Sequence, residues 1–155
     1  MTIFKTITDK KTEYEEHKLE KSLDLENLKQ LQSSGELELN KTPYSSLSEL
    51  ADSLYECRRS NKLSHRICLA MYGRDEDYDR LVHDPDWFVR EIVATKGRDK
   101  DLDVLVDDED VFVRQTVASH GRKKDLIELV GDESVLVRQE VVRQLRNQNG
   151  TKPKA

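Results

Sequence analysis

Four arginines recur at intervals of 24 residues along the chain: Arg66, Arg90, Arg114 and Arg138. A regular row of guanidinium groups can bind successive phosphates, because each group offers parallel N–H donors to two oxygens. Acidic residues lie near each of these arginines, however, and ion pairs within or between neighbouring segments would use the same donors. We favour this second interpretation, in which the arginines tie adjacent segments together.

Runs of acidic residues accompany the arginines, at residues 75–77, 107–110 and 132–133. Such runs could hold a hard cation, but a calcium loop needs a defined series of oxygen ligands that is absent here. Helix capping and solvation explain much of the acid content. An acidic surface that imitates nucleic acid remains an alternative, and its candidate patch consists of Asp107, Asp108, Glu109 and Asp110.

The residues that usually carry catalysis or bind metals show no pattern suited to either task. The four histidines share no metal-ligand spacing with one another or with the two cysteines; these residues are His17, His65, His83, His120, Cys57 and Cys68. No serine, cysteine or lysine lies in a motif that activates a nucleophile, and no glycine-rich phosphate loop occurs. We therefore expect no catalytic residue, no metal and no cofactor, and we do not expect an enzyme.

Composition limits the size and kind of fold. The chain has 155 residues, of which 35% are hydrophobic and 37% charged, so one domain with a thin, elongated core is expected. The net charge of -5 argues against direct binding to duplex nucleic acid, which favours a basic surface. No segment is apolar for long enough to be a signal peptide or a membrane span, so we expect a soluble, cytoplasmic protein without a membrane partner.

An internal repeat of 24 residues organises the chain from residue 49 to residue 144. Three blocks begin with a Gly-Arg pair and align without a gap at residues 73–96, 97–120 and 121–144, with each glycine as position 1. A degenerate copy precedes them at residues 49–72. Apolar residues recur at positions 6, 9, 10, 17, 21 and 22, aspartate recurs at position 12, and the arginine described above occupies position 18.

This spacing predicts two short helices per repeat, one around positions 6–10 and one around positions 17–22. Aspartate at position 12 is expected to be the N-cap of the second helix, with Pro85 and the following acids in its first turn. The glycine at position 1 is expected to cap the end of the preceding helix. Because 24 residues are fewer than the 40 to 47 or so of a HEAT or armadillo repeat, the helices must be short.

The segment DPDWFVREIVATKGRDKDLDVLVDDEDVFVRQTVASHGR resembles the leucine-rich repeat variant family, a relative of HEAT repeats with 24-residue helical units. The resemblance covers residues 73–144 well and residues 49–72 weakly. It implies an all-α fold, a short right-handed α-solenoid of about four repeats. Some members of that family carry an iron–sulfur cluster on a cysteine-rich N-terminal segment, which this chain lacks.

Residues 1–48 are expected to form an N-terminal cap on the repeats. Leucines at near-helical spacing predict a helix at about residues 13–32, with Leu19, Leu23, Leu28 and Leu31 on one face. Residues 1–8 and 35–40 alternate weakly and could form two short strands. Ser46 and Glu49 have the spacing of a capping box before the first helix of the degenerate repeat. We expect residues 145–155 to form a mobile tail.

A stripe of large apolar residues at position 16 is the most suggestive surface feature, because that position faces away from the predicted core. The stripe consists of Phe88, Phe112 and Leu136, flanked by Glu91, Gln115 and Gln139, and Trp87 begins it. Exposed apolar rows bordered by polar residues are typical of protein-binding surfaces. The alternative is that these side chains pack against the preceding helix or the next repeat.

We therefore predict a non-catalytic scaffold that binds another protein along the ridge of second helices. One alternative is an acidic inhibitor that occupies a nucleic-acid-binding protein, using the 107–110 patch. A second alternative is a HEAT-like DNA-repair enzyme, which the acidic excess of residues 73–144 disfavours because such an enzyme needs a basic concave face.

Overall fold

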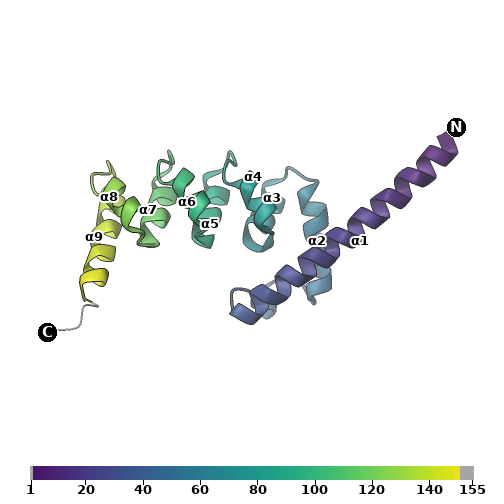
Figure 1. The fold of residues 1–155 in the computed structure, drawn as a ribbon, viewed down its shortest axis with the longest axis horizontal. Coiled ribbons are helices and arrows are strands. Elements are labelled where there is room, and N and C mark those ends of the chain that lie inside the picture. Colours follow the sequence, from purple (N-terminus) through teal and green to yellow (C-terminus); the bar gives the residue numbers. More distant parts are fainter. Residues whose placement is uncertain (1, 151–155) are drawn as a thin grey trace. The chain divides into compact units, whose positions relative to one another are not determined.

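In the computed structural model, which describes residues 2–150, every regular element in that range is a helix (Figure 1). The all-α prediction is therefore confirmed for these residues. The elements are α1 (Thr2–Ser34), the 3-10 helix η1 (Leu39–Lys41), α2 (Leu47–Arg58), α3 (Leu63–Tyr72), α4 (Asp75–Leu81), α5 (Trp87–Lys96), α6 (Asp99–Leu105), α7 (Val111–Ser119), α8 (Lys123–Leu129) and α9 (Val135–Gly150). None of the described helices has the length and apolar character needed to cross a membrane.

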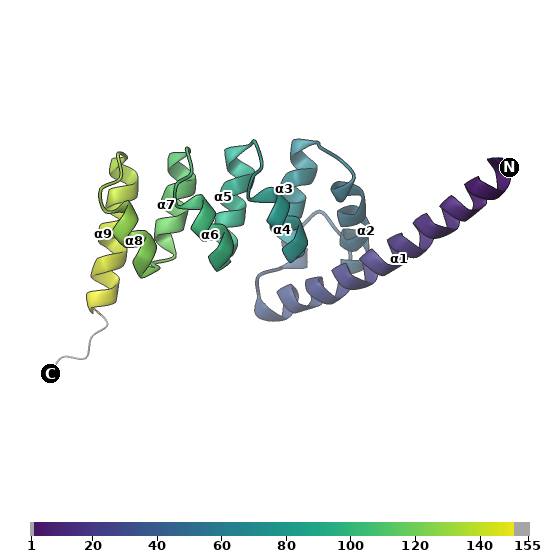
Figure 2. The same ribbon diagram turned by 45° about the horizontal axis from the view of Figure 1, so that its top comes forward.

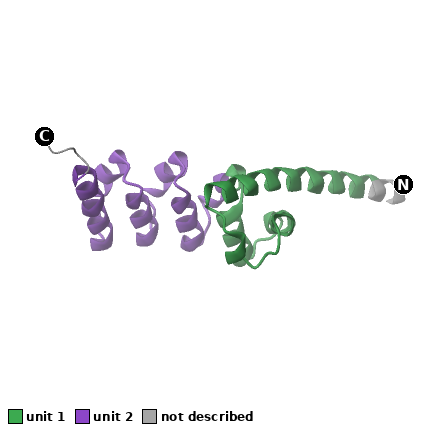
Figure 3. Ribbon diagram, turned by 90° about the horizontal axis from the view of Figure 1, so that it is seen from below, with its two compact units in different colours: residues 1–77 green, residues 78–155 purple. Residues whose placement is uncertain are grey.

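Two compact units make up the chain, residues 1–77 and residues 78–155 (Figure 3). In the first unit α1 packs on α2, and α2 packs on α3. The helix predicted at residues 13–32 is longer than expected, since α1 begins at Thr2 and ends at Ser34. The two predicted strands are wrong: residues 2–8 are helical, and residues 35–40 form no strand. A helix satisfies its own backbone hydrogen bonds, whereas a strand needs a neighbouring strand that this unit does not offer.

The leucines of α1 do not form the single buried stripe that their spacing predicts. Leu28 is fully buried against the unit, but Leu19 and Leu23 are exposed. Polar contacts replace them on the packed face, where the ring of His17 stacks on that of Tyr55 with centroids 4.0 Å apart. Towards its N-terminus α1 extends beyond α2, and residues 8–16 are exposed (Figure 2).

Ser46 is the N-cap of α2, as its spacing from Glu49 predicts, but the return hydrogen bond of the box is made to the residue before the cap. The Ser46 Oγ accepts a hydrogen bond from the Glu49 backbone N–H at 3.1 Å, and the Glu49 Oε2 accepts one from the Ser45 N–H at 2.8 Å. Behind this cap, Leu50 and Leu54 are fully buried. The box thus fixes the first residue of α2 and places its apolar face towards the core of the unit.

In the second unit the longer helices α5, α7 and α9 lie side by side, and the short helices α6 and α8 alternate with them (Figure 2). Positions 17 and 21 of each repeat form the centre of the core, at Val89, Val93, Val113, Val117, Val137 and Val141, all with no exposed surface. Leucines at position 9 of the short helices cover them from one side. Neighbouring long helices of this unit therefore bury one another's apolar faces.

The predicted N-cap is displaced by two residues. Asp86 and Asp110, at position 14, cap α5 and α7, so Pro85 precedes the helix and neither first turn contains an acid. The aspartate at position 12 instead accepts the backbone N–H of the capping residue; the Asp108 Oδ1 lies 2.9 Å from the Asp110 nitrogen. The two aspartates, which are two residues apart, therefore have different roles. The first stabilises the turn before the helix, and the second is the N-cap of the helix.

The glycine at position 1 is the C-cap of α3 and of α5, as predicted, but at α7 the C-cap is His120 and Gly121 follows it. Gly97 is the C-cap of α5 with a φ of 74°, in the left-handed region that glycine tolerates best. Gly73 caps α3 with a φ of -71°, an angle that any residue can adopt, so the backbone conformation does not require glycine here. At Gly73 a Cβ would clash with the carbonyl oxygen of Leu69, and this close approach explains the missing side chain.

At the C-terminus, α9 continues to Gly150, so residues 145–150 of the predicted tail are helical. Each residue added to an existing helix gains a backbone hydrogen bond without a new nucleation step, which allows a polar sequence to continue the helix. The remainder of the predicted tail, residues 151–155, lies outside the described residues.

Candidate functional site

The predicted ridge residues stand at the beginnings of the long helices of the second unit. Trp87 and Phe88 are the first two residues of α5, and Phe112 and Leu136 are the second residues of α7 and α9. The helix caps fix the backbone that carries them. The Asp86 Oδ1 accepts from the Phe88 N–H at 2.9 Å, and the corresponding distances are 2.8 Å at Phe112 and 3.3 Å at Leu136.

All four side chains are partly exposed. The exposed fractions are 42% for Trp87, 41% for Phe88, 46% for Phe112 and 39% for Leu136, whereas the valine that follows position 16 is fully buried in each repeat. One residue along a helix turns the side chain by about 100°, which carries it from the core to the surface. The position-16 side chains therefore lie partly on the surface, and the structure decides between the two arrangements that the sequence left open.

Trp87 joins the aromatic side chains of two neighbouring helices into one surface. Its ring centroid lies 5.7 Å from that of Phe88, in an edge-on arrangement, and 5.5 Å from that of Phe112. These are ordinary separations for attractive aromatic pairs. The ridge is thus continuous from α5 to α7, and its shape depends on the packing of one helix against the next.

The flanking residues at position 19 differ in how freely they could bind a partner. Glu91 is half-buried, and its Oε1 accepts a hydrogen bond from the Thr116 Oγ1 at 3.3 Å, which connects α5 to α7. Gln115 is also half-buried, whereas Gln139 is exposed. The polar border of the ridge therefore contains one structural carboxylate and two amides.

Two of the position-18 arginines, Arg90 and Arg114, bind an aspartate of the next repeat, whereas Arg66 donates to the backbone carbonyl of Asn61. Arg90 donates from Nε to the Asp108 Oδ2 at 2.7 Å, and Arg114 donates in the same way to Asp132 at 2.7 Å. Hydrogen bonds to these carboxylates raise the pKa of both arginines. The predicted ion pairs are confirmed for Arg90 and Arg114, whose guanidinium groups are buried and so do not form a phosphate-binding ladder.

Of the predicted acidic patch, only two members remain available. Asp108 holds Arg90, and Asp110 is the N-cap of α7. Glu109 is almost fully exposed, 3.7 Å from the Arg90 guanidinium, and Asp107 is exposed. The charge of Asp107 raises the pKa of Glu128, which indicates that these two carboxylates lie close to each other.

A second series of ion pairs, which was not predicted, joins positions 2 and 5 of the repeats. Arg98 donates from Nε to the buried Asp101 Oδ2 at 2.6 Å, and Arg122 donates to Asp125 at 2.6 Å. The Arg98 Nη2 also bonds the Asp79 Oδ1 of the preceding repeat at 2.9 Å. The signal was present in the sequence, because arginine at position 2 and aspartate at position 5 recur in all three repeats.

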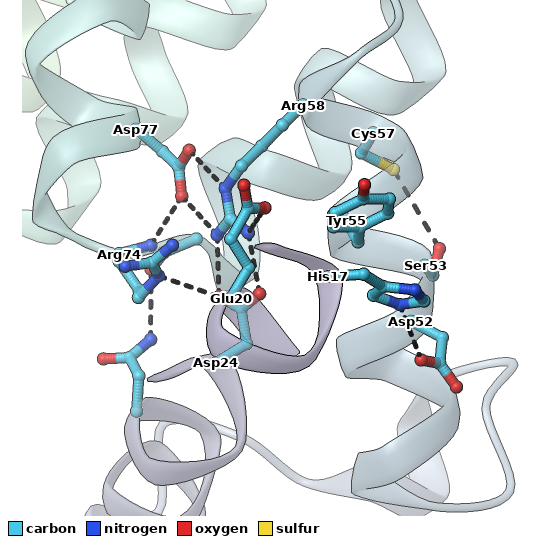
Figure 4. Close-up of polar contacts among 12 residues, drawn as sticks. His17, Glu20, Asp24, Asp52, Ser53, Tyr55, Cys57, Arg58, Arg74 and Asp77 are labelled. Atoms are coloured by element: carbon cyan, nitrogen blue, oxygen red, sulfur yellow. Dashed lines mark hydrogen bonds and ion pairs between the residues drawn. The ribbon is translucent and has the colours of Figure 1, made fainter. Parts of the chain in front are cut away.

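Near the degenerate repeat, a buried network of charges replaces this ladder (Figure 4). Arg58 lies between two aspartates: its Nη1 and Nη2 each donate to Asp24 at 2.7 Å, and its Nε donates to Asp77 at 2.8 Å. Arg74 also donates to Asp24, at 3.0 Å. Asp24 has no exposed surface. Its hydrogen bonds to Arg58 and Arg74 connect α1 to α2 and to the segment that precedes α4.

The Cys68 thiol is held in its protonated form. Burial, followed by the nearby Cys57 sulfur, raises the pKa of Cys68 to about 11, which leaves little thiolate at neutral pH. The Tyr44 hydroxyl lies 3.7 Å from the Cys68 Sγ. In the part of the chain that the structure describes, no three His, Cys, Asp or Glu side chains gather as the ligands of a metal would.

Comparisons with protein-family models, with curated proteins and with solved structures found no match to this chain. Functional inference therefore depends on the residues and geometry described above.

Proposed function

We propose that this chain is a non-catalytic scaffold that binds another protein along the ridge formed by Trp87, Phe88, Phe112 and Leu136. The observation that carries the proposal is the continuity of the exposed aromatic surface from α5 to α7, through the two ring contacts of Trp87. Tryptophan is among the residues that most often dominate binding energy at protein interfaces, and phenylalanine is enriched in the buried centres of such interfaces.

The energy available at the ridge supports a specific interaction. Burying a whole phenylalanine or leucine side chain contributes about 1.5–3 kcal/mol, so the two fifths still exposed contribute on the order of 1 kcal/mol each. Four such side chains on one rigid surface would provide the centre of an interface. Gln115 and Gln139 would supply hydrogen bonds at its border.

We further infer that the repeats form a short right-handed α-solenoid of the leucine-rich repeat variant kind. The Arg90–Asp108 and Arg114–Asp132 pairs support this inference, since each joins one repeat to the next in the same way. A solenoid presents equivalent positions in a row, which suits a ridge that binds an extended surface of a partner.

The test replaces Phe88 and Phe112 together by serine. Capture of a partner from native lysate should be lost in this variant, while helicity by circular dichroism and the melting temperature stay close to those of the unaltered chain. The matched control is Val104→Ser on α6, an equally exposed apolar residue outside the ridge, which should leave capture intact. A large fall in the melting temperature of the Phe88/Phe112 variant would show that the rings stabilise the fold.

The acidic-decoy function remains the second candidate, and the exposed carboxylates of Asp107 and Glu109 favour it. It requires binding that weakens steeply with salt, because exposed charges are screened within about 10 Å at 0.1 M salt. Replacing these two residues by Asn and Gln should then abolish capture without unfolding the chain. Capture that persists at high salt and in this variant would eliminate the decoy.

A further inference from the structure

In the earlier repeats of the second unit, certain apolar residues are covered by the repeat that follows. In the last repeat the equivalent residues are exposed. Valine at position 10 is buried at Val82 and Val106 but 58% exposed at Val130. Position 22 is fully buried at both alanines, Ala94 and Ala118, but 44% exposed at Val142. The exposed face of α8 and α9 is therefore built like an interior surface, with apolar residues where a covering element would lie.

Arg138 on this face lacks the carboxylate partner that the equivalent arginines have. In the two preceding repeats the equivalent arginine is buried and donates to an aspartate of the next helical segment. Arg138 is exposed, and its Nη1 donates to the backbone carbonyls of Asp132 at 2.7 Å and Glu133 at 3.0 Å. In Arg114 the Nε and Nη2 atoms each donate to an oxygen of Asp132. In Arg138 no carboxylate among the described residues forms an ion pair with these two atoms.

The charge of the face is positive, in contrast to the acidic repeats. Arg138 and Arg146 line a shallow hollow on α9 together with Val135 and Val142. Arg143 also lines it but is neutralised by Glu140, 2.5 Å away. A covering element must therefore combine apolar side chains with at least one carboxylate.

We propose that the exposed face of α8 and α9, defined by Val130, Arg138, Val142 and Arg146, binds an amphipathic helix of a partner protein that places an aspartate or glutamate on Arg138. The Arg114–Asp132 pair is the template for the contact. Arg138 and Val142 lie on the opposite side of α9 from the ridge residue Leu136, while Gln139, which borders the ridge, also lines the hollow. A second copy fits poorly, because pairing the same face would oppose Arg138 and Arg146 to themselves.

The test uses a displayed library of helical peptides, about five turns long and randomised on one face, selected on the full chain. Affinities of the selected peptides are then measured by fluorescence anisotropy for the unaltered chain and its variants. We expect an acidic residue at one shared position, and binding at least tenfold weaker to Arg138→Gln and to Val142→Asp. Arg80→Gln, an exposed arginine on α4, should bind within twofold, as should the Phe88/Phe112 serine variant.

Two results would overturn the proposal. The first is a set of selected peptides that share no acidic residue, or that bind Arg138→Gln as tightly as the unaltered chain. Either outcome would show that Arg138 does not recognise a carboxylate of the bound helix. Sedimentation that reveals a dimer dispersed by Val142→Asp would assign the face to a second copy. Because the ridge variant is measured in the same assay, failure here leaves the proposed function of the ridge untouched, and the reverse also holds.

Discussion

Arg114 and Asp132 are 18 residues apart in the sequence and form a two-pronged ion pair between consecutive repeats. The Nε–Oδ2 distance is 2.7 Å and the Nη2–Oδ1 distance is 3.1 Å. The third guanidinium nitrogen donates to the carbonyl of Asp108 at 2.8 Å, so one side chain links the loop before its own helix to the next repeat. Both side chains are more than nine tenths buried.

Replacing Arg114 by glutamine should destabilise the chain by about 3 kcal/mol, because Asp132 would keep a buried charge without its partner. Urea unfolding followed by circular dichroism would measure the loss. Arg138→Gln is the matched control, since it changes the same residue at the same repeat position where no carboxylate is held. It should cost less than about 1 kcal/mol. Equal losses in the two variants would contradict a stabilising role for the ion pair.

The stability of the chain should fall in acid through Asp132. The hydrogen bond from Arg114 holds the pKa of this carboxyl below its ordinary value. A carboxyl with a lowered folded pKa contributes stability that is complete above the unfolded pKa, about 3.9, and is lost as the pH falls through the folded pKa.

Unfolding free energies measured from pH 7 to pH 2 should therefore decrease below about pH 4. In Arg114→Gln the decrease should be smaller, because the pKa of Asp132 no longer differs as much between the folded and unfolded states. An NMR titration of the Asp132 carboxyl in both chains provides the direct measurement. An unchanged midpoint in the variant would contradict the assigned cause.

Gly97→Ala should destabilise the second unit by about 1–2 kcal/mol, the cost of a left-handed backbone for a residue with a side chain. A Cβ there would also lie 2.7 Å from the Cε1 of His120, whose ring bonds the Ala94 carbonyl at 2.7 Å. Thermal unfolding would detect the loss. Gly131→Ala, where a Cβ meets nothing within 4 Å, should be nearly neutral. A comparable loss at Gly131 would refute the conformational explanation.

Asp24→Asn should destabilise the first unit by about 3 kcal/mol, because Arg58 and Arg74 would lose the charge that faces them in a buried site. Asp52→Asn is the control on the same helix pair. Asp52 is half exposed and pairs with Lys21 at 2.9 Å, so its replacement should cost less than about 1 kcal/mol. Hydrogen exchange of α1 amides would show whether the helix detaches; equal exchange in both variants would argue against the network.

The 24-residue period by itself determined the helical class and the core positions, and it placed Phe88 and Phe112 outside the apolar arc without deciding whether they pack against a neighbour. These follow from spacing, since burial on one side of a short helix selects the same positions in each repeat. The position-18 ion pairs were also predictable, because an arginine beside the apolar arc needs a carboxylate. The N-cap was not, since Asp84 and Asp86 are chemically equivalent and only the path of the loop decides which one begins α5.

The tertiary structure alone decided which repeated residues are covered. Val106 and Val130 occupy the same position with the same side chain, yet one is buried and the other exposed, because burial depends on whether another repeat packs there. In the same way α1 is held by Asp24 and His17, polar residues that a search for apolar stripes passes over. Periodicity in a sequence predicts which face of each helix is apolar. Only the tertiary structure determines which of these faces are buried against another element.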